Sequence, residues 1–357
     1  MFERQTLIVV GAGASSEVGL PVGAELKRRI ADLLDIRFED GYRQDAGDRT
    51  ICDAFRVVVE RSVLPTRDIN PYLHVCWRIR NAMPQALSID NFIDVNQGDE
   101  KLELSGKLGI AKAILEAERN SRLFIDPRGR DPRIEFHALE NTWFASFLQL
   151  LTENCRLDDL ERRLSTIAAI VFNYDRCLEQ FLFHALQNYY SIDAAHTTAL
   201  LSKLTIYHPY GQIGALPWQN VRQNMPYGAE PSAVQLLDVA QQIRTFTEGT
   251  DPASSHIGAI RSRLVDSQII MFLGFAFHPL NLDLLSPQGA QHPEPDQVRY
   301  FATAKGISDP DCRMIARELA QLAGAPEGHI SLHNGFGCQQ LFREYWRTLS
   351  LARRTQG

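Results

Sequence analysis

The chain has 357 residues, of which 45% are hydrophobic and 22% charged. This balance is typical of a folded globular protein and excludes a collagen-like or disordered chain. Thirty-seven basic and 43 acidic residues give a net charge of −6, so we expect no direct binding of nucleic acid and no attraction to an anionic membrane surface.

The six cysteines lie far apart, without a CxxC pair or a zinc-ribbon spacing. This pattern predicts free thiols and no metal site. The apolar run at the N-terminus is too short for a signal peptide, and no run approaches the roughly 18 to 20 apolar residues that cross a bilayer. We therefore expect a protein of the reducing cytoplasm.

The predicted elements begin with a continuous apolar run at residues 6–10 that ends in Gly11. Such a run is typical of a central strand of a parallel sheet, covered on both faces. Residues 23–36 carry apolar side chains at helical spacing and predict an amphipathic helix.

Residues 48–165 have helical patterns throughout, interrupted by an exposed loop at 119–133. Within them, residues 88–94 predict a short helix with Ser88 as its N-cap. Its acidic residues, Asp90 and Asp94, are most simply interpreted as a solvent-exposed helix face. The aromatic residues around Trp143 recur at helical spacing and are assigned to the core.

A second apolar run occurs at residues 166–172, and further strand candidates are residues 204–207, 268–273, 298–303 and 329–332, with helical patterns after most of them. This alternation predicts an α/β fold with a doubly wound, Rossmann-like parallel sheet. We expect the sheet to be formed by residues 1–47 and 166–357, and an all-helical module, residues 48–165, to be inserted into it.

A glycine-rich segment directly after the first strand is the strongest local signal for ligand binding. Its backbone N–H groups are expected to cradle a pyrophosphate, although a plain tight turn is the alternative. The segment consists of Gly11, Ala12, Gly13, Ala14 and Ser15. Ser16 replaces the third glycine of the dinucleotide fingerprint, which argues against an ordinary dehydrogenase. Glu17 either caps the following helix or contacts a ribose.

Three further segments end strands and carry polar groups or glycine. Asn173 and Asp175 follow the second sheet strand, where α/β sheets place their ligand crevice; Asp175 alternatively caps the next helix. His208 leaves a short strand and is a candidate general base or a structural histidine. Gly274 ends an apolar strand and leaves room for a flat base or a ribose, or is a strand end with an aromatic cap.

Taken together and in this order, these segments resemble the motifs of sirtuin-like proteins. Residues 11–15, continuing to Gly-Leu-Pro at 19–21, resemble Gly-Ala-Gly-x-Ser, and residues 172–175 resemble the Asn-x-Asp motif. His208 with Gly211 resembles the catalytic histidine region. Gly274, Phe275 and Asn281 resemble the Gly-Phe-x-Phe-x-x-x-Asn of the bacterial sirtuin-like branch, as Ser88 to Asp94 resembles its Ser-Ile-x-x-Phe helix.

The chain departs from the protein deacetylases of this family. It lacks their four-cysteine zinc module, has Val22-Gly23 where they carry an aromatic residue and an arginine, and reads Phe-Asn-Tyr-Asp for Gln-Asn-Ile-Asp. The resemblance therefore implies the antiphage branch, which cleaves NAD to nicotinamide and ADP-ribose and depletes the infected cell of NAD.

The resemblance also implies roles for individual residues. Residues 11–15 and Glu17, with Gly274, Phe275 and Asn281, would bind NAD, which is the substrate. Asn173 would orient the ribose or the attacking water, Asp175 would hold the nicotinamide carboxamide, and His208 would be the base. No metal is implied.

Two other functions stay open, namely a sensor that binds NAD or ADP-ribose without turnover, and a zinc-free deacylase or ADP-ribosyltransferase. A toxic hydrolase needs control, so we expect a homo-oligomer or a partner. By family analogy the partner is a HerA-type hexameric ATPase or a short Argonaute, and the helical module supplies contacts or a lid.

Overall fold

The computed structural model describes residues 4–62, 67–130, 132–245, 248, 256–287, 289–290 and 292–350. Its centre is a parallel sheet of six strands in the order β5-β4-β1-β6-β7-β8. The strands are β1 (Thr6–Val10), β4 (Ile167–Val171), β5 (Thr205–Tyr207), β6 (Ile269–Leu273), β7 (Arg299–Thr303) and β8 (Ile330–His333). Each coincides with a predicted strand to within about one residue, and β1 is central as predicted. The α/β fold with a doubly wound parallel sheet is thereby confirmed.

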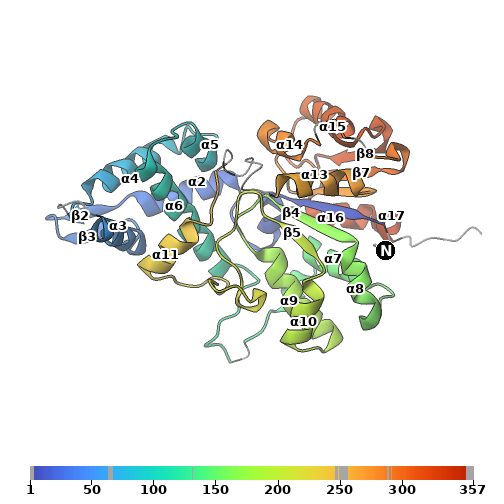
Figure 1. Cartoon of the computed structure of the whole chain (residues 1–357), viewed down its shortest axis with the longest axis horizontal. Coiled ribbons are helices and arrows are strands. Elements are labelled where there is room, and N and C mark those ends of the chain that lie inside the picture. The colour runs from blue at the N-terminus through green and yellow to red at the C-terminus, as the bar shows by residue number, and fades with distance from the viewer. Residues whose placement is uncertain are drawn as a thin grey trace, which may run out of the picture.

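Helices cover both faces of this sheet (Figure 1). Alternate residues of β1 serve the two faces: Ile8 and Val10 pack into one apolar cluster, and Leu7 and Val9 into the other. The first face is covered by α7 (Trp143–Thr152), α8 (Leu157–Ser165), α9 (Cys177–Tyr190), α10 (Ala194–Leu201), α16 (Cys338–Glu344) and α17 (Trp346–Ser350). The second is covered by α13 (Ile257–Asp266), α14 (Pro279–Leu285) and α15 (Asp309–Ala323).

A separate helical lobe lies beside the sheet, to the left in Figure 1, with an apolar cluster of its own. Its helices are α2 (Gly23–Leu34), α3 (Arg49–Arg61), α4 (Asn70–Ala82), α5 (Ile89–Asp94), α6 (Glu100–Arg119) and α11 (Ala233–Ala240). The lobe does not follow the expected boundaries 48–165. Helices α7 and α8 pack on the sheet, whereas α2 and α11, expected with the sheet, bury their apolar faces in the lobe.

Two short strands, β2 (Arg37–Glu39) and β3 (Arg43–Ala46), form an antiparallel hairpin that the sequence analysis missed. Both are polar and short, so they lack the apolar alternation of a half-buried strand. Asp40 and Gly41 in the turn have φ values of 51° and 75°, and an Asp-Gly pair is a known hairpin signal.

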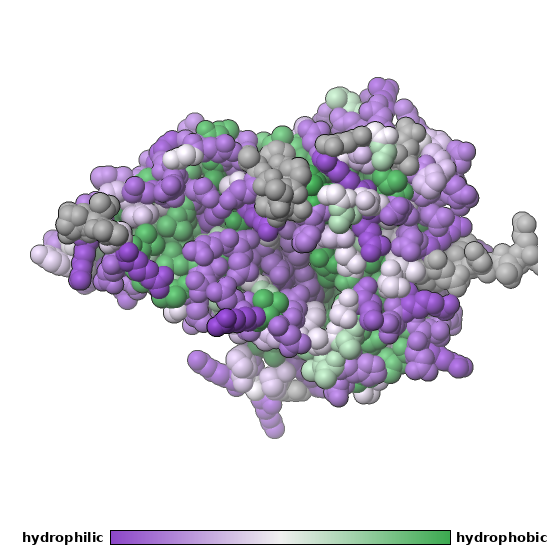
Figure 2. Space-filling model, in the orientation of Figure 1, coloured by the Kyte–Doolittle hydropathy of each residue, from purple (hydrophilic) through white to green (hydrophobic). Residues whose placement is uncertain are grey.

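The surface seen in Figure 2 is mostly hydrophilic, with smaller apolar areas between the charged side chains. Within the described ranges, no helix combines the length and the apolar character that crossing a membrane requires. The segment 120–135, apart from residue 131, which is outside the described residues, has no helix or strand, as predicted for the loop at 119–133.

Candidate functional site

The structure places the four predicted segments on the same side of the sheet, at the carboxyl ends of its strands, because each segment directly follows a parallel strand. Residues 11–15 follow β1, Asn173 and Asp175 follow β4, His208 follows β5, and Gly274 follows β6. After β1, the next sheet strands in the chain, β4 and β5, lie on one side of β1, and the following strands, β6 to β8, lie on the other side. This reversal next to β1 is the switch point at which open α/β sheets bind their ligands.

At this switch point the glycine-rich loop packs backbone to backbone against the end of β6. Gly11 N–H donates to Leu273 O at 2.9 Å, and Gly13 N–H donates to Gly274 O at 3.0 Å. A Cβ on Gly13 would lie 2.8 Å from Gly274 Cα. Gly274 itself has φ +57°, and a Cβ there would lie 2.0 Å from the Ala14 nitrogen. Only glycine permits this contact.

This contact occupies some of the backbone N–H groups that were expected to bind a pyrophosphate. The N–H groups of Gly11 and Gly13 bond to the β6 segment, and Ala14 N–H bonds to Gly11 O at 2.9 Å. Residues 12–15 form one short helical turn, α1 (Ala12–Ser15). Ala12 and Gly13 are only half-buried, so they are the residues of the loop that border the open edge.

Ser15 links the two predicted polar residues after β4. Asn173 Nδ2 donates to Ser15 Oγ at 3.1 Å, and Ser15 Oγ donates to Asp175 Oδ1 at 3.0 Å. Asp175 is buried and also accepts from the Cys177 N–H at 3.1 Å. Cys177 is the first residue of α9, so Asp175 does bond to the start of the following helix, which was the alternative interpretation. The same carboxylate also bonds to Ser15 in the candidate site.

Burial raises the pKa of the Asp175 carboxyl above its ordinary value, although the bonds from Cys177 and Ser15 act in the opposite direction. The hydroxyl of Ser15 thus holds the loop after β1 and the loop after β4 in one network. This arrangement fixes Asn173 at the edge of the sheet.

His208 pairs with Glu179, a residue of α9 that the sequence analysis did not select. His208 Nε2 lies 2.6 Å from Glu179 Oε1, and the side chains are 10% and 3% exposed. Burial lowers the pKa of His208, but the Glu179 carboxylate and the Asn173 backbone raise it more, so the net pKa is above the ordinary value. The only sequence signal was an acid in the first turn of a helix, which ordinarily serves the helix dipole.

Aromatic rings from the segments that follow β4, β5 and β6 pack against one another at the candidate site. The ring of Phe172 meets those of Tyr210 and Phe275 edge to face, with centroids 5.7 and 5.0 Å apart. Tyr210 Oη donates to Asn281 Oδ1. Of the two residues predicted to bind NAD here, Phe275 is therefore buried in an aromatic cluster at the site, and Asn281 is joined to that cluster through Tyr210.

The predicted short helix is α5, with Ser88 as its N-cap: Ser88 Oγ accepts from Asn91 N–H at 3.0 Å. Its acid Asp90 does not lie on a solvated face. Tyr174 Oη donates to Asp90 Oδ1, and burial raises the pKa of that carboxyl. Because Tyr174 stands between Asn173 and Asp175, the helical lobe touches the candidate site directly.

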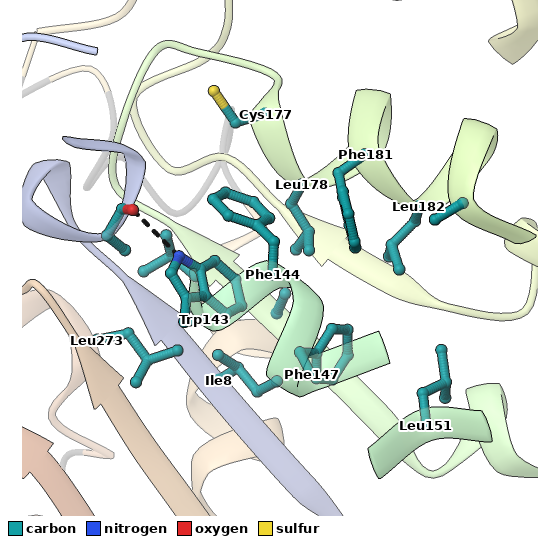
Figure 3. Packing of buried hydrophobic residues seen from close by; sticks show 14 of the residues in the cluster. Ile8, Trp143, Phe144, Phe147, Leu151, Cys177, Leu178, Phe181, Leu182 and Leu273 are labelled. Carbon is teal, nitrogen blue, oxygen red and sulfur yellow. Dashed lines mark hydrogen bonds between the residues drawn. The ribbon is translucent and has the colours of Figure 1, made fainter. Parts of the chain in front are cut away.

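Glu17 connects the glycine-rich loop to two helices that are distant in the sequence, which the sequence alone did not indicate. Its two carboxylate oxygens accept Trp143 N–H at 2.7 Å and Gln339 N–H at 2.9 Å, in the first turns of α7 and α16. Neither helix directly follows Glu17, and α2 has no side-chain cap, so of the two alternatives for Glu17 the cap of the following helix is wrong. The Trp143 indole in turn donates to Ala14 O at 3.1 Å, the bond drawn in Figure 3.

A pocket of about 380 Å³ opens elsewhere, between α9, the segment after α6 and residues 217–229. It is lined mainly by apolar side chains, among them Phe124, Phe183 and Trp218, and by none of the predicted site residues. Its size suits a small molecule, but its location differs from the edge of the sheet where the four segments meet.

Among the described residues, no cluster of three or more His, Cys, Asp or Glu side chains could hold a metal ion, and the six cysteines are unpaired. Comparison with protein-family models gives no match to this chain, and comparison with curated proteins gives none either.

Proposed function

We propose that this chain hydrolyses NAD at the bond between nicotinamide and ribose, releasing nicotinamide and ADP-ribose. The observation that carries the proposal is that Asn173 bonds to Ser15 of the glycine loop 11–15 and that its backbone contacts the ring of His208, all at the carboxyl ends of neighbouring strands. A dinucleotide needs such a close backbone approach for its pyrophosphate.

The residue chemistry fits a reaction at a sugar carbon. Cleavage of the glycosidic bond passes through an oxocarbenium-like state, which needs a shielded pocket and a positioned water. Asn173 would orient the ribose or that water, and His208 would accept the water proton. Asp175 would hold the carboxamide of nicotinamide; its bonds to Ser15 and Cys177 fix its orientation for this contact.

The half-buried part of the glycine loop, Ala12 and Gly13, would face the pyrophosphate. Gly274, Phe275 and Asn281 would border the same ligand from the β6 side, where the absence of a Gly274 side chain leaves space. Glu17 has no direct ligand contact in this proposal, because both its oxygens are bonded to helix N-termini.

We propose further that the activity serves antiphage defence by NAD depletion, in a homo-oligomer or with a HerA-type ATPase or a short Argonaute as partner. This step rests on the sequence resemblance. An active, monodisperse monomer that needs no partner would count against it.

A sensor that binds NAD without turnover is the second candidate. One observation favours it: Ser15, Asp175 and His208 already bond to other protein groups. An acyl-peptide assay and an ADP-ribose transfer assay would detect the zinc-free deacylase or transferase.

The test compares nicotinamide release by the wild type and by the Asn173→Ala, His208→Ala double variant. We expect release by the wild type and its loss in the double variant. Asn188→Ala and His196→Ala change exposed residues of the same types and should keep the activity. Robust cleavage by the double variant would overturn the proposal.

A further inference from the structure

The contact between Glu179 and His208 determines which ring nitrogen can carry a proton. Glu179 Oε1 lies 2.6 Å from His208 Nε2, and both side chains are almost fully buried. An ionised carboxylate only accepts hydrogen bonds. The hydrogen of the neutral imidazole must therefore sit on Nε2, which leaves the lone pair on Nδ1.

The other ring nitrogen has no such partner. His208 Nδ1 is buried and makes no hydrogen bond within the part of the chain that the structure describes. Besides Glu179, the backbone of Asn173 and then the carboxylate of Asp175 favour the protonated ring and raise the pKa of His208. Nδ1 is thus the atom that can take a proton, and it belongs to a ring placed among the predicted catalytic residues.

We propose that Glu179 is a positioning residue of the active site, which fixes the Nε2–H tautomer of His208 and so presents Nδ1 as the proton acceptor. This inference rests on the proposed function. As the bond between C1′ of the ribose and nicotinamide breaks, nicotinamide leaves with the bonding electron pair. The water oxygen bonds to C1′, and its proton passes to Nδ1 and then to solvent. NAD and water give nicotinamide, ADP-ribose and one proton.

The pair is poorly explained by packing alone. The second oxygen of Glu179, Oε2, is also buried and makes no hydrogen bond to any described residue. A buried carboxylate with an unused oxygen costs free energy that an apolar side chain of similar size would avoid. Retaining the acid at this place is consistent with a role that acts through His208.

Two substitutions separate charge from geometry. Glu179→Gln keeps an oxygen that can accept from Nε2–H and removes the charge, whereas Glu179→Ala removes both. We expect Glu179→Ala to lower kcat at least about 10-fold, the lower end of the losses seen when a residue that orients a functional histidine is removed, with KM changed by less than about threefold. Glu60→Gln, at an exposed glutamate, should match the wild type.

The pH profile supplies a readout that a merely structural role would not move. The carboxylate of Glu179 stabilises the imidazolium of His208, and the carboxylate of Asp175 adds to this effect. In Glu179→Gln the Asn173 backbone and Asp175 remain but the largest favourable contribution is lost, so the acidic limb of kcat/KM should shift to lower pH. Wild-type kcat in Glu179→Ala together with an unshifted limb in Glu179→Gln would overturn the inference.

Nitrogen NMR of ¹⁵N-histidine-labelled full chain tests the inference without activity. The His208 signal, assigned by its absence in His208→Gln, should show the Nε2–H tautomer, and its pKa should fall in Glu179→Gln. An Nδ1–H tautomer or an unchanged pKa would overturn the positioning role, including when Glu179→Ala does not fold. Absence of nicotinamide release with the expected tautomer would instead count against the proposed function alone.

Discussion

The conformation of Gly274 makes the candidate site sensitive to substitution at this residue. Its φ is +57°, and an added Cβ would lie 2.0 Å from the Ala14 nitrogen. We expect Gly274→Ala to lower the free energy of unfolding by about 1 to 3 kcal/mol and to weaken NAD binding, because the loop after β1 must move. Urea denaturation and calorimetry measure the two effects.

Gly258 provides the matched control for that substitution. It lies in α13, and a Cβ there would meet nothing within 4 Å. Gly258→Ala should be neutral or stabilise by up to about 1 kcal/mol. Equal effects of the two substitutions would contradict the backbone contact between the loop 11–15 and Gly274.

The raised pKa of His208 predicts a pH dependence of stability. A group with a raised folded pKa stabilises the fold below its unfolded pKa, about 6.5 for histidine, and this contribution is lost as the pH rises through the folded pKa. The wild type should therefore exceed the Glu179→Gln, His208→Gln double variant in Tm by more at about pH 6 than at about pH 9. A difference that is constant or grows with pH would contradict the pairing.

Some residues of the candidate site could be predicted from the sequence and others could not. Asn173, His208 and Gly274 can be recognised from the sequence because each directly follows a predicted strand. Glu179 cannot, because its contact with His208 joins residues of two elements, and nothing local to either residue indicates it. The bonds of Glu17 to residues 143 and 339 were hidden for the same reason.

At the scale of elements, Glu17 is predicted to stabilise two helices at once. Its carboxylate accepts N–H groups in the first turns of α7 and α16, which are otherwise unsatisfied within the helices. Glu17→Ala should lower the free energy of unfolding by about 1 to 3 kcal/mol, since a lost cap costs about 0.5 to 2 kcal/mol. Glu17→Gln, which keeps one accepting oxygen, should lose less, as measured by urea denaturation. A Glu17→Ala variant as stable as the wild type would contradict this role.

The central strands β1, β4 and β6 were predictable from sequence because they are buried and carry continuous apolar runs. The outer strands β5 and β8 are only half-buried, and their shorter apolar patterns still indicated them. The hairpin of β2 and β3 was not, since its residues alternate between exposed and half-buried positions. The extent of the helical lobe was also not predictable. An amphipathic helix such as α2 shows that one face is buried, but not whether the sheet or other helices cover it.

At the scale of the whole molecule, a buried ion pair ties the helical lobe to the sheet. Arg176 precedes α9, Glu118 belongs to α6, and both side chains are 0% exposed. Arg176 Nε donates to Glu118 Oε1 at 3.0 Å, and its other nitrogens donate to the carbonyls of Gly214, Met225 and Pro226. The pair therefore holds three separate segments of the chain next to Asp175.

Removing one partner would leave the other charge buried. We expect Glu118→Leu to lower the free energy of unfolding by about 3 to 5 kcal/mol, and the Glu118→Leu, Arg176→Met double variant to lose less than the sum of the single variants. Asp159→Ala, in an exposed ion pair with Arg162, should cost less than about 1 kcal/mol. Additive losses in urea denaturation would contradict the coupling.

Hydrolysis of NAD is tested most directly by chromatography of the products after the purified chain is incubated with NAD, alone and with candidate partners. We expect nicotinamide and ADP-ribose in equal amounts, with both lost in His208→Ala. Calorimetric binding of NAD without nicotinamide release under any of these conditions would contradict hydrolysis and favour the sensor.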